Sequence, residues 1–215
     1  MSDEPQNPPT PEDEQPAESS DGGQHGLTFL TISEIDIPPL LYSVEKDMPF
    51  QRCLHCDKDL FGGSDLYLIE KVVRGTETII ELAICLDCRQ GKSEQGMSED
   101  SMTALKGYFT GVNIIANQME SIRGEPMDTI DPWLARCAIS KRPRDELREY
   151  QIVAACEGDQ VQLGWFPMLL SGHVIEEISE LLSDETRGWM DDYVGDNFGM
   201  PSEFCEPPSY SPVLM

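Results

Sequence analysis

Residues 53–88 begin with Cys53-Leu54-His55-Cys56 and end with Cys85-Leu86-Asp87-Cys88. A Cys-x2-Cys unit can fold into a tight knuckle that directs both sulfurs toward one ion. Two such units complete a tetrahedral shell of four thiolates. The spacing therefore predicts a metal site whose ligands are Cys53, Cys56, Cys85 and Cys88.

The stretch between the two cysteine pairs is typical of a β-hairpin. Apolar and β-branched residues dominate residues 66–73 and again residues 78–84, and Arg74-Gly75-Thr76-Glu77 separates the two runs. Such runs around a glycine-containing turn favour two antiparallel strands. We therefore expect each cysteine pair to lie beside one strand of the hairpin.

Two Cys-x2-Cys knuckles that flank a hairpin resemble the zinc-ribbon class of folds, and the resemblance covers roughly 40 residues of the chain. It implies a structural Zn²⁺ held by the four cysteines. Ribbon knuckles often carry glycine directly after the second cysteine, where φ is positive, whereas this chain has Asp57 and Arg89. Aspartate adopts a positive φ more readily than arginine does, so we expect the first knuckle to fit the pattern better.

The four cysteines also allow other interpretations. Iron in a rubredoxin-like site would use the same four thiolates, although zinc is favoured. Four ordinary thiols would need no metal, and a redox pair is disfavoured because neither cysteine pair lies between a strand and an obvious following helix. His55 is a fifth candidate ligand, but four thiolates already close the shell, so we expect it to be an exposed residue of the knuckle.

Composition divides the 215-residue chain into four segments. Residues 1–26 are rich in proline and acids and contain no Lys, Arg, Ile, Leu, Val or Phe, so we expect them to be disordered. Residues 27–124 should form the ribbon-like hairpin and a long helix, and residues 125–199 a second hairpin-plus-helix unit. Residues 200–215 are proline-rich and should form a second disordered tail. The predicted fold class is α+β, with amphipathic helices packed on the hairpins.

The sequence predicts a cytoplasmic protein. Its amino terminus is acidic and lacks an apolar core, and no apolar run approaches the ~20 residues of a membrane helix. Seven cysteines are present, and the three outside the predicted metal site are Cys137, Cys156 and Cys205. We expect these three to be free thiols in a reducing compartment.

The formal net charge of -25 disfavours nucleic acid as a partner, because such a field repels phosphates. Acidic residues directly follow the basic cluster Lys141-Arg142-Pro143-Arg144, which favours a solvated loop with local charge pairs. A nucleic-acid-binding ribbon is the alternative hypothesis. It requires five basic side chains to gather on one face, namely Lys71, Arg74, Lys141, Arg142 and Arg144.

Two segments of the chain share a pattern. Arg52-Cys53 precedes a strand that begins Tyr67-Leu-Ile, and Arg136-Cys137 precedes one that begins Tyr150-Gln-Ile. The pattern suggests two degenerate hairpin-plus-helix repeats in which Ser140 replaces the second cysteine of the first knuckle. The counterpart of the second cysteine pair is absent near Met168, so the second unit would hold no metal and would depend on apolar packing.

Apolar residues recur every three or four positions over residues 99–122. This stripe predicts one continuous helix that Ser98 caps and that ends at Gly124. A shorter stripe predicts a helix over residues 172–182, and Ser183 should cap a further helix.

The sequence shows no catalytic constellation. His173 is not brought near a cysteine by any recognisable spacing, and no phosphate-binding glycine motif occurs. We therefore predict a non-enzymatic zinc-binding protein that acts as an adaptor or regulatory module. Its acidic tails suit a protein partner with a basic surface. The alternatives are a nucleic-acid-binding zinc ribbon, or a redox protein or enzyme that uses the cysteine pairs.

Overall fold

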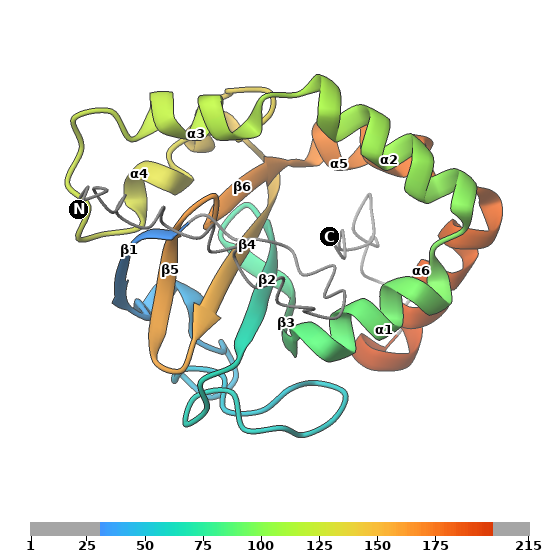
Figure 1. Ribbon diagram of the computed structural model, residues 1–215, viewed down its shortest axis with the longest axis horizontal. Coiled ribbons are helices and arrows are strands. Elements are labelled where there is room, and N and C mark those ends of the chain that lie inside the picture. Colours follow the sequence, from blue (N-terminus) through green and yellow to red (C-terminus); the bar gives the residue numbers. More distant parts are fainter. Residues whose placement is uncertain (1–30, 200–215) are drawn as a thin grey trace, which may run out of the picture.

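The computed structural model describes residues 31–199. The predicted tails, residues 1–26 and 200–215, lie outside this range. The described chain is an α+β fold in which helices lie above and to the right of a six-stranded antiparallel sheet in the view of Figure 1. Among the described residues, no helix combines the length and apolar character that crossing a membrane requires.

The sheet has the strand order β1-β5-β4-β2-β3, and β6 pairs with β4 beside β5. Its strands are β1 (Thr31–Asp36), β2 (Leu66–Arg74), β3 (Glu77–Cys85), β4 (Glu149–Glu157), β5 (Gln160–Gly164) and β6 (Met168–Ser171). The hairpin predicted between the cysteine pairs is confirmed as β2 and β3, with Gly75 at φ 62° in its turn. Positive φ explains why glycine stands there.

The central contact of the sheet joins the two halves of the chain. Strand β2 pairs with β4 along its whole length, from Leu66 opposite Glu157 to Arg74 opposite Glu149. Both strands are almost wholly buried. The described parts of the two predicted units, residues 31–124 and 125–199, therefore share one sheet and one core.

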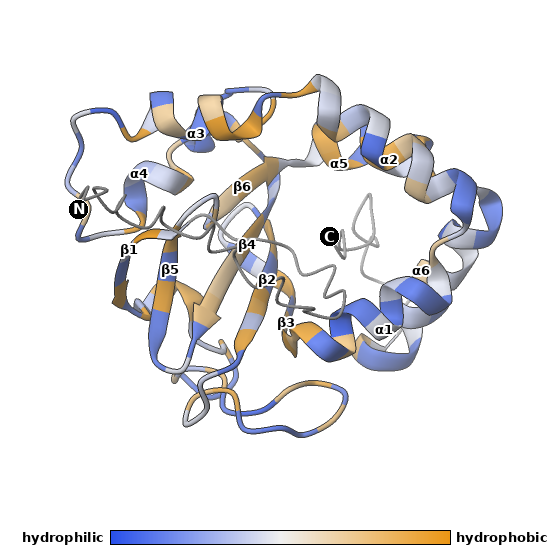
Figure 2. Ribbon diagram, viewed as in Figure 1, coloured by the Kyte–Doolittle hydropathy of each residue, from blue (hydrophilic) through white to orange (hydrophobic). Residues whose placement is uncertain are grey.

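Six α-helices and two short 3-10 turns complete the described fold. They are α1 (Leu86–Gly96), α2 (Glu99–Gly111), α3 (Ile114–Ser121), α4 (Asp131–Leu134), α5 (Gly172–Glu180), α6 (Asp184–Phe198), η1 (Pro39–Leu41) and η2 (Arg144–Glu146). The predicted N-caps are confirmed, because Ser98 accepts a hydrogen bond from the Ser101 amide and Ser183 from the Thr186 amide. Figure 2 shows apolar residues concentrated in the strands and polar residues on the outer helices.

The prediction of one continuous helix over residues 99–122 is wrong. The helix breaks at Val112, and Asn113 caps a new helix by accepting a hydrogen bond from the Ala116 amide at 3.0 Å. Spacing of three and four continues through the break, so an apolar stripe alone does not reveal it. The sequence signal for the break was Asn113, because asparagine side chains favour helix caps over helix interiors.

Gly96 brings α1 close to α6. A Cβ atom at this position would lie 2.0 Å from Cδ2 of Trp189, so only glycine permits the observed approach. Helix α1 carries Cys88, and α6 carries a contact to the first knuckle described below. The packing at Gly96 therefore supports the position of both.

We predict that Gly96→Ala lowers the free energy of unfolding by about 1–3 kcal/mol, because the added methyl group overpacks the α1–α6 contact. The matched control is Gly91→Ala in the same helix, where a Cβ atom meets nothing within 4 Å. That variant should gain up to about 1 kcal/mol from helix propensity. Urea unfolding of both variants measures the difference, and equal stabilities would contradict the proposed packing role.

A carboxyl group is buried where β2 and β4 meet. Glu70 is 1% exposed and lies opposite Val153. Its Oε2 accepts a hydrogen bond from Gln151 at 2.7 Å, whereas its Oε1 has no hydrogen-bond partner. Burial raises the pKa of Glu70 to about 8, although the charge of Arg89 and the bond from Gln151 oppose the rise.

This raised pKa predicts a pH dependence of stability. Between about pH 5 and 8 the unfolded state loses the Glu70 proton while the folded state keeps it, so stability should fall as the pH rises through this window. Glu70→Gln cannot ionise and should be more stable than the wild type at pH 8, with a smaller difference at pH 5. Urea midpoints at the two pH values measure this, and parallel pH profiles for the two proteins would contradict it.

Candidate metal centre

The structure brings the four predicted cysteines together. The Sγ atoms of Cys53, Cys56, Cys85 and Cys88 all lie within 4.8 Å of one another, and those of Cys56 and Cys85 are 3.8 Å apart. Zn–S bonds of ~2.3 Å place the sulfurs of a tetrahedral site about 3.8 Å apart. The donor set and its spacing therefore fit a four-coordinate metal ion.

The first pair forms a knuckle whose backbone is closed by hydrogen bonds. The Cys53 amide donates to the Lys58 carbonyl at 2.9 Å, and the Asp57 amide donates to the Cys53 carbonyl at 3.1 Å. Asp57, which directly follows the second cysteine of this pair, has a φ of 56°, a conformation that aspartate adopts more readily than most residues. The Leu54 amide donates to the Ala83 carbonyl at 2.9 Å and so attaches the knuckle to β3.

The second pair lies at the junction of a strand and a helix. Cys85 is the last residue of β3 and also the N-cap of α1, and Cys88 lies in the first turn of that helix. The premise that no helix follows a cysteine pair is therefore wrong, and Arg89 lies within the helix instead of in a positive-φ knuckle. Helix α1 has a low apolar content, which concealed it in the sequence. Its N-terminus favours thiolates, because the helix dipole places partial positive charge there.

The surroundings of the cluster shift the pKa values of Cys53, Cys85 and Cys88 in different directions. Burial disfavours the thiolate of Cys53, but the amides of Cys56, Cys85 and His55 outweigh it and lower the pKa of Cys53 to about 7. Burial raises the pKa values of Cys85 and Cys88, and the thiols of Cys53 and Cys56 raise both further, although hydrogen bonds from Cys88 partly oppose the rise at Cys85. A bound dication would oppose the increases at Cys85 and Cys88, because a coordinated thiol is held as thiolate.

His55 is not among the residues grouped around the potential metal position. Its Nε2 lies 2.7 Å from the Tyr193 hydroxyl, and the two rings are 5.4 Å apart. His55 is thus partly buried against α6, which corrects the expectation of an exposed knuckle residue. Tyr193 was missed from the sequence because it lies 138 residues from His55 and no local pattern connects the two.

The other described cysteines lie outside the cluster. Cys137 and Cys156 are both buried free thiols. Burial raises the pKa of Cys156 to about 12, which makes it a poor nucleophile. His173 is exposed and lies beside Glu176 and Glu177 on its own helix. Cys205 lies outside the described residues.

The predicted basic cluster contains local charge pairs. Lys141 lies 2.8 Å from Glu120, and Arg144 lies 4.0 Å from Asp131. Lys71, a member of the set that nucleic-acid binding requires, is 3% exposed and pairs with Glu81 at 3.2 Å. These pairings remove much of the positive surface on which the nucleic-acid alternative depends.

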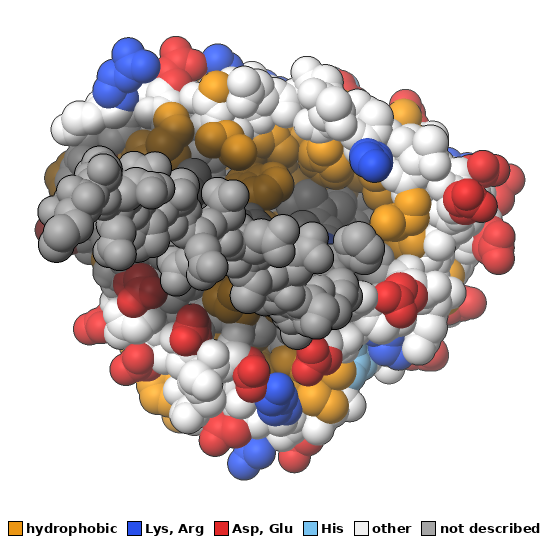
Figure 3. Space-filling model, in the orientation of Figure 1, with side chains coloured by type: hydrophobic (Ala, Val, Ile, Leu, Met, Phe, Trp, Pro, Cys, Tyr) orange, Lys and Arg blue, Asp and Glu red, His pale blue; other side chains and the backbone are white. Residues whose placement is uncertain are grey.

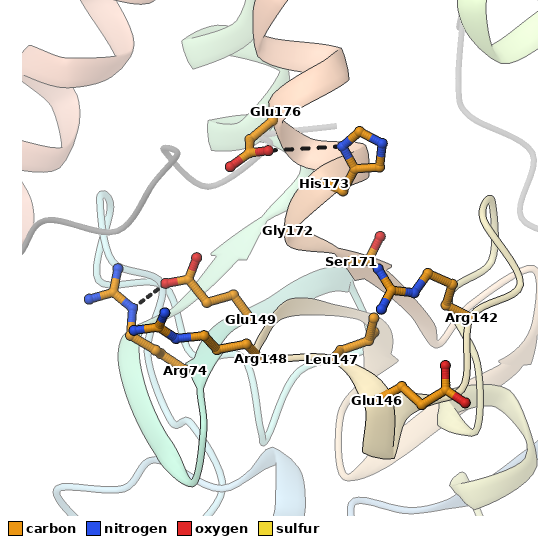
Figure 4. Close-up of a pocket in the computed structure, with 10 residues that line it drawn as sticks. All are labelled: Arg74, Arg142, Glu146, Leu147, Arg148, Glu149, Ser171, Gly172, His173 and Glu176. Atoms are coloured by element: carbon orange, nitrogen blue, oxygen red, sulfur yellow. Dashed lines mark hydrogen bonds and ion pairs between the residues drawn. The ribbon is translucent and has the colours of Figure 1, made fainter.

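A cavity of about 340 Å³ lies at the start of α5 (Figure 4). Its charged lining residues are Arg74, Arg142, Arg148, Glu146, Glu149 and Glu176, and His173 also lines it. Arginines and glutamates are equally represented, and Arg74 pairs with Glu149. The charges therefore largely offset one another, and the cavity lacks the excess positive charge that selects an anionic ligand.

Comparison of the chain with protein-family models, with curated proteins and with solved structures finds no match.

Proposed function

We propose that the protein is a non-enzymatic zinc protein in which Cys53, Cys56, Cys85 and Cys88 hold one Zn²⁺ in a zinc-ribbon-like unit. The observation that carries this proposal is the grouping of the four Sγ atoms within 4.8 Å of one another. Iron also accepts four thiolates, so zinc is the favoured ion rather than the sole candidate. Four protein ligands leave no position for water or substrate, which supports a structural role over hydrolysis.

The location of the cluster indicates what the ion would stabilise. The segment between η1 and β2 contains only isolated β-bridges, such as Ser43 with Met48 and Arg52 with Asp59. A metal ion would tie this irregular segment to the end of β3 and to the first turn of α1. The contact from His55 to Tyr193 would extend that support to α6.

Metal analysis tests this part of the proposal. Protein purified without added metal should contain one equivalent of zinc by elemental mass spectrometry. Cys56→Ser combined with Cys88→Ser should lose that zinc and several kcal/mol of stability, which corresponds to a fall in melting temperature of about 10 °C or more. A wild-type protein without metal would contradict the proposal. A coloured protein that contains iron would mean that the bound metal is iron and not zinc.

The matched control removes two cysteines outside the cluster, by Cys137→Ser combined with Cys156→Ser. Both side chains are buried, so this variant perturbs the core at least as much as the test variant does. It should retain one equivalent of zinc. Loss of zinc from the control as well would mean that metal content reports general unfolding and not ligation.

We further propose that the protein binds another protein that has a basic surface, in an adaptor or regulatory role. Acidic side chains predominate over basic ones on the face in Figure 3, and the whole chain has a formal charge of -25. Such a surface attracts basic partners and repels nucleic acid. A cytoplasmic location, which would keep the thiols reduced for the metal, remains part of the same prediction.

Affinity capture from native lysate tests the partner hypothesis. The full chain should retain a reproducible protein at about 0.15 M salt and lose it at about 0.5 M, because salt screens charge pairs. A chain lacking residues 1–26, which carry only acidic charge, should retain less of it. Capture of nucleic acid in place of protein would favour the alternative ribbon function, and capture of neither would contradict both.

A further inference from the structure

The knuckle of the metal centre has a counterpart in the second half of the chain. There the Cys137 amide donates to the Arg142 carbonyl, and the Lys141 amide donates to the Cys137 carbonyl, both at 2.9 Å. The Ala138 amide donates to the Leu169 carbonyl at 2.8 Å. These three bonds repeat, in the same order, the bonds that close the first knuckle and attach it to β3.

The backbone conformation of the two knuckles also agrees. Lys141 has a φ of 59°, and Asp57 has a φ of 56° at the equivalent position. Lysine, unlike asparagine or aspartate, rarely adopts this conformation, so its presence is not explained by local preference. The second half therefore keeps the turn of a metal-binding knuckle although only Cys137 of the cysteine pair is present.

The surroundings of the sulfur atoms match as well. The Cys85 amide donates to Cys53 Sγ at 3.5 Å, and the Ser171 amide donates to Cys137 Sγ at 3.3 Å. Like Cys85, Ser171 ends a strand and caps a helix, with φ and ψ of -70° and 151° against -67° and 153°. The Ser140 and Ser171 hydroxyl oxygens lie 3.4 Å apart. The equivalent atoms of the metal centre, Sγ of Cys56 and Sγ of Cys85, lie 3.8 Å apart.

Strand pairing identifies the equivalent positions independently of the knuckles. Tyr67 of β2 lies opposite Cys85, and Tyr150 of β4 lies opposite Ser171. The counterpart of the second cysteine pair is therefore Ser171 with Val174, three residues beyond the position near Met168 that the sequence suggested. Val174, which is 1% exposed in the first turn of α5, takes the place of Cys88.

The N-terminal caps of α2 and α6 also correspond between the two halves. The Ser98 amide at the start of α2 donates to Thr186 Oγ1 at 3.0 Å, and the Ser183 amide at the start of α6 donates to Ser101 Oγ at 2.9 Å. The two cap hydroxyls, Ser98 and Ser183, lie 2.9 Å apart. A reciprocal exchange of this kind is the contact expected across a two-fold axis. The antiparallel pairing of β2 with β4 is the equivalent contact in the sheet (Figure 1).

We propose that the two halves of the chain are copies of one hairpin-plus-two-helix unit, and that Cys137, Ser140, Ser171 and Val174 occupy the four ligand positions of a second metal site that has lost its metal. We name this set the vacated site. The inference rests on the proposed metal centre, because that centre supplies the template. Neutral hydroxyls are weak zinc ligands and valine is none, so the vacated site holds together by hydrogen bonds and burial.

The experiment restores the missing ligands in the full chain through Ser140→Cys, Ser171→Cys and Val174→Cys together. Zinc content by elemental mass spectrometry should rise from one equivalent to two, a twofold change, and Co²⁺ titration should show the thiolate charge-transfer band with twice the wild-type amplitude. The matched control introduces three cysteines that lie outside the vacated site, by Ser121→Cys, Ser179→Cys and Val194→Cys. It should remain at one equivalent.

A milder variant covers the case in which cysteine at the buried Val174 position prevents folding. Ser140→Cys with Ser171→Cys presents three thiolates together with Cys137, and it should bind a second zinc more weakly, with water as the fourth ligand. Serine and cysteine are close in size, and the first half holds cysteine at both equivalent positions. Failure of this milder variant to fold would therefore contradict the inference.

The outcomes separate this inference from the proposed function. A wild-type protein without any metal overturns the proposed metal centre. If the wild-type protein holds one equivalent of zinc and the folded ligand-restored variants also hold only one, the vacated site alone is overturned. A second equivalent in the ligand-restored variant and not in the control establishes the correspondence of the two halves.

Discussion

The antiparallel pairing of β2 with β4 is the contact on which the rest of the described structure depends. Strand β2 supplies the hairpin whose partner, β3, ends in Cys85, and β4 carries both β5 and β6. The two strands are buried along nearly their whole length, and their apolar residues belong to one core that includes both halves of the chain. Separation of the halves would leave β2 and β4 each with an unpaired edge, which is why the pairing holds one sheet together across both halves.

A polar group interrupts this apolar contact at its centre. Glu70 is bonded to Gln151 and lies in the field of Arg89, yet one of its oxygens has no hydrogen-bond partner. Burial of such a group costs free energy unless its hydrogen bonds are satisfied or it stays protonated. Arg89 directly follows Cys88, so the buried carboxyl is electrostatically connected to the helix turn that carries the metal ligands.

The candidate site combines local and distant contributions. Its four ligands follow from two short motifs, since a Cys-x2-Cys spacing places both sulfurs on the same side of a tight turn. The hairpin between the motifs then brings the turns together, because Tyr67 and Cys85 pair at the open end of β2 and β3. Tyr193 contacts His55 from a position 138 residues later in the chain. This contact could not be predicted, because no sequence pattern near α6 indicates which residue Tyr193 will meet.

The sequence by itself determined the features that short-range interactions control. These are the four-cysteine cluster, the β2–β3 hairpin and the helix caps at Ser98 and Ser183, each of which depends on residues within one motif, turn or hairpin. The tertiary structure alone decided the pairing of β2 with β4 and the meeting of the two cap serines. The physical reason is that these features depend on which buried surfaces find each other across long chain separations. The spacing of apolar residues indicates that one face of a helix or strand is apolar. It does not identify the element that packs against that face.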